Sequence, residues 1–133
     1  MENPRVRIEH IALNVPDPAA MAEWYGQHLG MRIVRRVDGP PHTRFLADDA
    51  GRTVLELYRQ DAVPVPDYFQ QDPLTLHIAF LSDAIDEDRL RLLAAGAKGT
   101  GEIKTTPTGD RMTFLHDPWG VAVQLVTRVE PLV

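Results

Sequence analysis

The feature that most constrains the fold of this chain is an internal repeat. Residues 10–13 read HIAL, and residues 77–80, which lie 67 positions later, read HIAF. Further along, FLADDAG at 45–51 corresponds to FLHDPWG at 114–120, with Phe, Asp and Gly each 69 positions apart. Several landmarks at one period are typical of a structural unit that is used more than once. The sequence therefore predicts two similar modules of roughly 65 residues.

The strand expected at the start of each module has one apolar face. In HIALNV, the apolar Ile11, Leu13 and Val15 alternate with polar or small residues, which is typical of a strand with one side on a core. We expect this apolar face to pack against the module's helix. His10 then points to the opposite face, and the same reasoning applies to His77 in the second module.

An amphipathic helix is predicted after the first strand. Asp17 and Pro18 are typical of a helix start, and Gly30 is typical of a helix end. Between these residues the apolar positions recur at helical spacing and form one stripe: Ala20, Met21, Trp24, Tyr25 and Leu29.

The rest of each module is predicted to consist of strands. In the first module three β-rich runs follow the helix, so the element order is βαβββ. The second module repeats this order, with a helix in which Leu90, Leu93 and Ala94 fall on one face. The expected strands are 31–37, 42–48 and 52–58 in the first module, and 74–82, a weak run near 99–104, 111–117 and 121–126 in the second.

These elements predict an α+β fold in which two tandem βαβββ modules form a curled, cup-like mixed sheet with the helices outside. We expect one domain over residues 1–133, with module one at about 5–60 and module two at about 74–128. The connector at 61–73 has no periodicity and is rich in proline, so it could also form a wall of a pocket.

The composition excludes several classes of function. The net charge of -5 leaves no basic field for nucleic acid or for an acidic membrane surface. Without cysteine there is no disulfide framework, no thiolate metal site and no cysteine nucleophile. No apolar run approaches the ~20 residues that span a bilayer, and the first ten residues lack the pattern of a signal peptide. We therefore expect a cytoplasmic protein.

Four polar side chains are expected to face one hollow. His10 and His77 open the first strands of the two modules, while Glu56 and Gln124 each lie between two apolar residues of a last strand. Two imidazoles, one carboxylate and one amide that converge would form a divalent metal site with nitrogen and oxygen ligands. This donor set suits Zn, Ni, Co, Mn or Fe and does not choose among them.

The other candidate residues have simpler interpretations. A lone histidine in a strand is more often structural than a ligand, and only the symmetric placement of two histidines favours a metal. His28 and His116 are interpreted as ordinary polar positions, and His42, which adjoins two prolines, as a loop residue that could also line the pocket. Three aromatic residues are candidates either for pocket walls or for packing: Tyr58, Tyr68 and Phe69.

The chain resembles the vicinal oxygen chelate superfamily, which includes glyoxalase I, methylmalonyl-CoA epimerase, fosfomycin-resistance enzymes, bleomycin-binding proteins and extradiol dioxygenases. The resemblance is carried by the paired βαβββ modules, by HIA at the opening of each, by LG after the first helix and by DPWG before the last strand. It covers almost the whole chain. It implies a small-molecule substrate and a homodimer with sites near the interface.

The resemblance also implies the metal ligands. The superfamily takes one ligand from the first strand and one from the last strand of each module, and these positions are His10, Glu56, His77 and Gln124 here. The first three match the pattern of glyoxalase I, whereas that enzyme has Glu at the fourth position. In the superfamily the ion binds two neighbouring oxygens and stabilises an enolate-like charge. Because the last-strand carboxylate is the base in glyoxalase I, the catalytic candidates are Glu56 and Gln124, and standard glyoxalase I activity is not expected.

Three functions follow from the sequence. The preferred one is a metal-dependent, glyoxalase-like lyase or isomerase with one divalent ion per chain, acting on a small oxygen-rich molecule. The second is an extradiol-type dioxygenase, in which Fe(II) needs two His and one carboxylate. The third is a non-catalytic binder of a small molecule or antibiotic, of the bleomycin-resistance type, and the presence of the metal residues argues against it. The sequence does not identify the substrate, the metal or the base.

Overall fold

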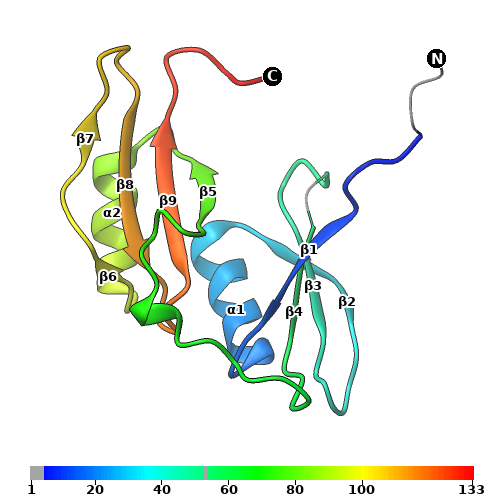
Figure 1. Ribbon diagram of the computed structural model, residues 1–133. Helices are drawn as coiled ribbons and strands as arrows, with labels where there is room; N and C mark the ends of the chain where they lie inside the picture. Colours follow the sequence, from blue (N-terminus) through cyan, green and yellow to red (C-terminus); the bar gives the residue numbers. More distant parts are fainter. Residues whose placement is uncertain (1–4, 53) are drawn as a thin grey trace. The chain divides into compact units, whose positions relative to one another are not determined.

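The computed structural model describes residues 5–52 and 54–133, and its chain divides into two compact units (Figure 1). Unit one is Met1–Pro66 and unit two is Asp67–Val133. Each unit contains one helix of ten or more residues and one mixed sheet, so the α+β class is confirmed. No helix in the described residues is long and apolar enough to cross a membrane.

Unit one has the predicted order βαβββ. Its sheet has the strand order β1-β4-β3-β2, in which β1 pairs with β4 in parallel and the other pairs are antiparallel. The expected strand at 52–58 is observed from residue 54, and residue 53 lies outside the described residues. The elements are β1 (His10–Asn14), α1 (Pro18–Leu29), β2 (Arg32–Arg36), β3 (Arg44–Ala47) and β4 (Val54–Tyr58).

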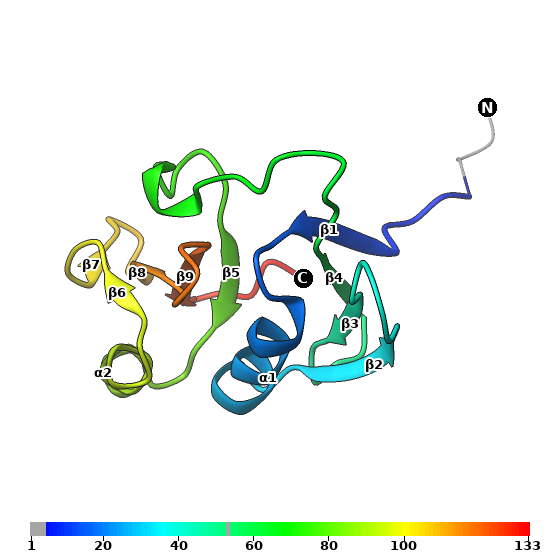
Figure 2. The same cartoon turned by 90° about the horizontal axis from the view of Figure 1, so that it is seen from below.

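Helix α1 begins and ends where the sequence predicts. The Asp17 carboxylate accepts a hydrogen bond from the Ala20 backbone N–H at 3.1 Å, and Pro18 occupies the first helical position, where no N–H is needed. Gly30 ends the helix in the left-handed region with φ 70°, which favours glycine. The helix covers one face of the sheet of unit one (Figure 2).

The core face of unit one differs from the prediction at one end of β1. Leu13 and Val15 are buried, as are Leu55 and Leu57 on the adjacent strand β4. The expectation that Ile11 belongs to this core is wrong, because Ile11 is 52% exposed. Helix α1 packs chiefly on β2, β3 and β4, so the start of the edge strand β1 remains uncovered.

Unit two repeats the arrangement of unit one. The sheet order is β5-β9-β8-β6, β7 also pairs with β8, and the pair β5–β9 is parallel like β1–β4. Helix α2 covers one face of this sheet (Figure 2). The elements are η1 (Tyr68–Gln70), β5 (Ile78–Leu81), α2 (Ile85–Ala94), β6 (Lys98–Gly99), β7 (Lys104–Thr105), β8 (Arg111–His116) and β9 (Ala122–Thr127).

Two strands of unit two are shorter than predicted. The run at 74–82 forms a strand only from Ile78, because Asp72 folds the preceding residues into a turn in which its carboxylate and its carbonyl accept the backbone N–H groups of Leu74 and Thr75, each at 2.8 Å. His77 therefore lies just before β5. The weak run near 99–104 is divided into β6 and β7, which both pair with β8.

The predicted apolar face of α2 is wrong. Leu90 is 64% exposed, whereas Ile85 and Leu92 are buried against the sheet. Residues seven apart lie on the same side of a helix, while Leu90 is turned by about 140° from Ile85. The sequence spacing identified an apolar stripe, but the stripe that packs on the sheet is the one that contains Ile85 and Leu92.

Strand register confirms the repeat. Ala12 of β1 lies opposite Glu56 of β4, and Ala79 of β5 lies opposite Gln124 of β9. The two modules therefore pair their first and last strands in the same register. The landmarks of the sequence repeat are equivalent in space within each unit.

The turn before the last strand is also repeated. In unit one the Asp48 carboxylate accepts the Arg52 backbone N–H at 3.1 Å, and in unit two the Asp117 carboxylate accepts the Val121 backbone N–H at 2.9 Å. In both turns the following glycine has a positive φ and donates its N–H to the carbonyl of the aspartate. This shared turn explains the Asp and Gly of FLADDAG and FLHDPWG.

Candidate metal centre

The predicted donors form two pairs, one in each unit. We define half-site one as His10, Phe45 and Glu56 and half-site two as His77, Phe114 and Gln124. Phe45 lies opposite Glu56 across β3 and β4, and Phe114 lies opposite Gln124 across β8 and β9. In strands β4 and β9 the neighbours of the donor are buried leucine and valine residues, so the donor points to the face away from the helix.

Half-site one joins an imidazole to a carboxylate. Nε2 of His10 lies 3.4 Å from Oε1 of Glu56, and these side chains are 35% and 19% exposed. Nδ1 of His10 lies 2.9 Å from Oε1 of Glu9. The His10 ring meets the Phe45 ring edge-on, with 6.0 Å between their centroids. The ring is thus held by the carboxylate of Glu9 on one side and by an aromatic ring on another.

Half-site two has the same frame around an amide. Nδ1 of His77 lies 2.8 Å from the backbone carbonyl oxygen of Pro73, and the ring meets Phe114 edge-on at 5.0 Å. Gln124 is buried, with 7% of its surface exposed. Its Nε2 donates to Sδ of Met112 at 3.5 Å. An amide therefore takes the place of the carboxylate of half-site one.

Both histidines have the nitrogen arrangement that a metal ligand needs. A carboxylate and a carbonyl oxygen only accept hydrogen bonds, so Nδ1 of His10 and Nδ1 of His77 carry the hydrogen. In the neutral ring Nε2 then holds the lone pair, and in His10 this nitrogen faces Oε1 of Glu56 at 3.4 Å. Metal-bound histidines usually donate their other ring N–H to a carboxylate or a backbone carbonyl. The residues present thus fit a divalent ion with nitrogen and oxygen donors.

The four donors are divided equally between the units. Within residues 5–52 and 54–133, no three His, Asp or Glu side chains form a cluster that could hold a metal ion. Unit one brings together His10 and Glu56, and unit two supplies His77 and Gln124. The complete four-ligand set remains a prediction.

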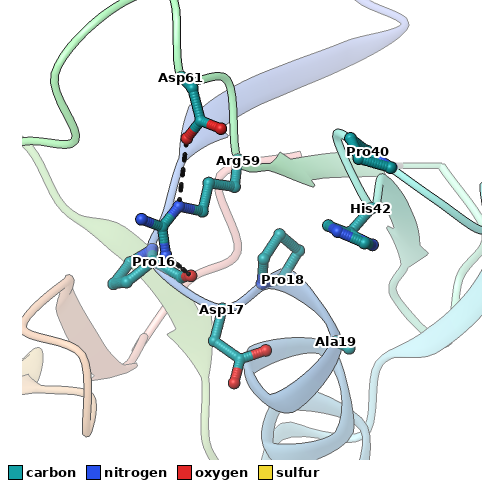
Figure 3. A pocket seen from close by; sticks show the side chains of 8 residues that line it. All are labelled: Pro16, Asp17, Pro18, Ala19, Pro40, His42, Arg59 and Asp61. Atoms are coloured by element: carbon teal, nitrogen blue, oxygen red, sulfur yellow. Dashed lines mark hydrogen bonds and ion pairs between the residues drawn. The ribbon is translucent and has the colours of Figure 1, made fainter.

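A separate hollow of about 460 Å³ lies in unit one (Figure 3). Arg59 donates to the Pro16 carbonyl at 3.1 Å and pairs with Asp61 at 3.4 Å, so its guanidinium ties the ends of β1 and β4 together. None of the four predicted donors lines it. The lining residues are Pro16, Asp17, Pro18, Ala19, Pro40, His42, Arg59 and Asp61.

The remaining histidines lie at the end of strand β8, on helix α1 and in the turn between β2 and β3. His116 approaches the Gly120 carbonyl with its Nδ1 at 2.7 Å, within the turn before β9. The His28 ring packs on Trp24 with 5.2 Å between centroids. His42 lies in the turn between β2 and β3, with φ 61°.

The aromatic candidates of the connector belong to the packing of unit two. Tyr68 is buried. The Phe69 ring lies 5.7 Å from the His116 ring, and Nζ of Lys98 lies 5.0 Å from its centroid. Phe69 also closes on Gly120, where an added Cβ would lie 2.7 Å from its ring and from its backbone nitrogen. This residue thus fixes η1 to the turn before β9.

Sequence reasoning missed the residues that support the donors. Phe45 and Phe114 were visible as a repeated Phe, but their contact with the histidines depends on how β1 and β5 pair within the sheets. Met112 carried no signal in the sequence, because its partner is two positions away diagonally on the adjacent strand.

The carboxylates with a shifted pKa lie outside the half-sites. Hydrogen bonding from Arg111, at 2.9 and 3.1 Å, holds the pKa of Asp86 below its usual value, and the same contact raises the pKa of Arg111. The backbone N–H of Val129, with help from Arg128, lowers the pKa of Asp110. These groups stabilise unit two and are not part of the candidate site.

Comparison with known proteins identifies the family. The sequence profile of the Glyoxalase/Bleomycin resistance protein/Dioxygenase superfamily matches residues 7–125. The chain belongs to this superfamily. It is 31% identical over 117 residues to the ethylmalonyl-CoA/methylmalonyl-CoA epimerase of Cereibacter sphaeroides. The matched region covers 83% of this chain and 87% of that protein.

Solved structures share the superfamily fold. A glyoxalase family protein from Bacillus cereus has a TM-score of 0.80 at 18% identity and covers 97% of this chain and 98% of its own. An antibiotic binding protein from a Streptomyces species has a TM-score of 0.71 at 21% identity, with 95% and 98% covered. At these identities the likeness shows the fold alone. The resemblance inferred from the repeat is confirmed.

Proposed function

We propose that this chain is a metal-dependent, glyoxalase-like enzyme of the lyase or isomerase type that acts on a small oxygen-rich molecule. The donors would be His10, Glu56, His77 and Gln124. The observation that carries the proposal is that both histidines contact an oxygen acceptor through Nδ1, and that Nε2 of His10 faces the carboxylate of Glu56, the second predicted donor of its unit, at 3.4 Å. The proposal requires that His10 and Glu56 of one module and His77 and Gln124 of the other bind the same ion. The two modules could belong to one chain or to two copies of it.

The residues of the chain divide the chemistry between them. When bound, a divalent ion supplies Lewis-acid polarisation of neighbouring substrate oxygens. Glu56 is the only anion among the four donors, and its carboxylate is partly exposed, so it is the residue that could take a proton from a substrate carbon. The amide of Gln124 cannot accept that proton, and it serves as a neutral oxygen donor.

The curated relative favours an isomerase over a lyase. That protein is named as an epimerase of ethylmalonyl-CoA and methylmalonyl-CoA. Inverting the branched carbon of such a molecule requires that its proton leave and return, and the carbonyl oxygens on either side suit Lewis-acid polarisation. We take 2-substituted malonyl thioesters as the first substrate class to test.

The test is proton exchange at that carbon. The protein loaded with one divalent metal is incubated with methylmalonyl-CoA in deuterated water, and deuterium at the branched carbon is followed by mass spectrometry. We expect exchange that Glu56→Gln slows by about 100-fold or more, since a positioned base contributes 10²–10⁴-fold. Glu23→Gln, an exposed carboxylate on α1, is the matched control. Equal exchange in both variants would remove Glu56 from the mechanism.

Standard glyoxalase I activity should be negligible. The position that holds the base in that enzyme is Gln124 here, and an amide does not move a proton. Turnover of the glutathione hemithioacetal of methylglyoxal should therefore be at background, and Gln124→Glu should raise it if the pocket admits that adduct. Robust turnover by the natural protein would show that another group, such as Glu56, moves the proton.

The donor set also suits the alternative of an extradiol dioxygenase. Two histidines and one carboxylate are the set that Fe(II) needs in such enzymes, and His10, His77 and Glu56 provide them. Oxygen uptake with Fe(II) and a catechol would favour this function over the isomerase. Tight binding of a small molecule without any metal would favour a non-catalytic binder instead.

We also propose that the protein acts as a homodimer. Apolar side chains are exposed along the segment that enters the edge strand β1, where Val6 is 85%, Ile8 79% and Ile11 52% exposed. A second copy would cover this apolar edge. Light scattering should give twice the chain mass of 14.9 kDa, and Val6→Asp with Ile8→Asp should lower it, whereas Leu90→Asp on α2 should not. A monomeric mass for the natural protein would contradict this proposal.

A further inference from the structure

Gln124 is held by a sulfur atom in half-site two. Its Nε2 lies 3.5 Å from Sδ of Met112, and Gln124 itself is buried. In the antiparallel pair β8–β9, Gln124 lies opposite Phe114 and Met112 lies opposite Val126. Met112 is therefore the diagonal neighbour of Gln124 on the same face of the sheet.

The chemistry of the contact fixes which end of the amide faces Met112. A thioether has lone pairs but no hydrogen to donate, so it accepts hydrogen bonds only. The NH₂ end of Gln124 must therefore face the sulfur, because the reversed amide would place two acceptors against each other. The carbonyl oxygen Oε1 occupies the other end of the planar group and is turned away from Met112.

The same face of unit two carries the other donor. His77 precedes Ala79 by two positions, and Ala79 lies opposite Gln124 across the parallel pair β5–β9. The Phe114 ring lies opposite Gln124 in the sheet and meets the His77 ring edge-on at 5.0 Å. Half-site two thus brings the imidazole of His77 and the amide of Gln124 to the same phenylalanine.

We propose that Met112 is a positioning residue that fixes the amide of Gln124 with its carbonyl oxygen presented to the divalent ion. This inference rests on the proposed metal site. The orientation matters because an amide nitrogen offers no lone pair to a metal, so a reversed Gln124 would remove one of the four donors. Met112 keeps the amide in its ligating orientation before the ion binds.

Half-site one shows why an orienting contact such as that between Met112 and Gln124 is needed in unit two alone. The carboxylate of Glu56 has two equivalent oxygens, so either orientation presents a donor. The position that corresponds to Met112, 69 residues earlier, is Thr43. A symmetric anion needs no orienting partner, whereas an amide does.

The experiment uses Met112→Leu, which removes the acceptor and keeps the side-chain volume, an exchange that folded proteins usually tolerate. Mn²⁺ affinity is measured by calorimetry on the full chain, and the side-chain NH₂ signals of Gln124, identified by their loss in Gln124→Glu, are followed by NMR without metal. Met31→Leu, a buried methionine in unit one, is the matched control.

We expect Met112→Leu to weaken Mn²⁺ binding by about tenfold, as for other residues that orient a ligand, and to shift the Gln124 NH₂ signals. In a Gln124→Ala background the same change should have no effect on affinity, because there is no amide left to orient. Unchanged affinity and unchanged NH₂ signals in Met112→Leu, with normal Mn²⁺ binding by the natural protein, would overturn this inference alone. A natural protein that binds no divalent ion would instead overturn the proposed function.

Discussion

Half-site one and half-site two have the same frame but different charges. Each places a histidine before or at the start of a first strand, edge-on to a phenylalanine that lies opposite the last-strand donor. The donor is a carboxylate in unit one and an amide in unit two. The comparison teaches that the repeat fixes where a donor is placed. The difference between a carboxylate oxygen in Glu56 and an amide nitrogen in Gln124 decides whether that donor can carry a charge or accept a proton.

The turns before the last strands also share a backbone conformation but differ in the residues around it. Gly51 and Gly120 occupy the same position of the repeat and both have positive φ, 71° and 98°. Around Gly51 the nearest atom to an added Cβ would be the end of the flexible Arg32 side chain at 3.5 Å, whereas around Gly120 it would be the ring and backbone of Phe69 at 2.7 Å. The connector has thus made one of two equivalent turns intolerant of any side chain.

The largest effect is expected from alanine at these two turns. Gly51→Ala should lower the free energy of unfolding by about 1 kcal/mol, the cost of a left-handed backbone with a Cβ. Gly120→Ala should cost about 3 kcal/mol, because overpacking against Phe69 is added to the same backbone cost. Urea unfolding of the two variants measures the difference. Equal losses would show that the contact with η1 does not constrain the turn.

Exchanging the donors between the modules sharpens the comparison of the half-sites. Glu56→Gln removes the only anion of the four donors and should weaken binding of a divalent ion by about tenfold to 100-fold. Adding Gln124→Glu returns one negative charge at the equivalent position, so the double variant should bind within about tenfold of the natural protein. Calorimetric titration with Mn²⁺ tests this. A double variant no better than Glu56→Gln would show that the half-sites are not interchangeable as ligands.

The smallest effect concerns acid stability, which is expected to differ between the units. In unit two Arg111 joins β8 to Asp86 of α2 and lowers the pKa of Asp86, whereas Arg59 and Asp61 of unit one are only two residues apart. Because the pKa of Asp86 is lower in the folded protein than its usual value, this contribution is present at neutral pH and is lost as the pH falls through the folded pKa.

Unfolding of Asp86→Asn measured at several pH values checks the sign. The variant should be less stable than the natural protein at neutral pH, and the difference should vanish below the folded pKa of Asp86. Arg111→Gln should give the same loss, and the double variant should lose no more than either single change. Asp61→Asn in unit one should leave stability unchanged, as is usual for exposed local pairs. A difference that grows on acidification would contradict this assignment.

The sequence predicted most of the fold because its signals were local. The Asp17 cap, the Gly30 stop and the alternation around Leu55 and Leu57 each depend on a few neighbouring residues, and the structure has them where they were expected. The buried face of α2 and the exposure of Ile11 could not be predicted in this way. They depend on how each helix packs on its sheet and on which strands it covers.

The candidate site was predicted in part for the same reason. Strand alternation identified the four donors, and the structure brings His10 to Glu56 within unit one. The partners that hold Nδ1 of His10 and of His77 and the sulfur that holds Gln124 could not be predicted, because they depend on side-chain positions in three dimensions. The meeting of the two pairs at one ion remains a prediction.

The most direct measurement of that prediction is the metal content of the natural protein and of the histidine variants, purified without chelator and analysed by mass spectrometry of the elements. We predict about one divalent ion per chain in the natural protein, a loss of affinity of tenfold or more for His10→Ala and for His77→Ala, and no ion in the double variant. The fold should persist in all of them, because neither ring belongs to the buried core. An ion retained at full occupancy by the folded double variant would contradict the proposed metal centre.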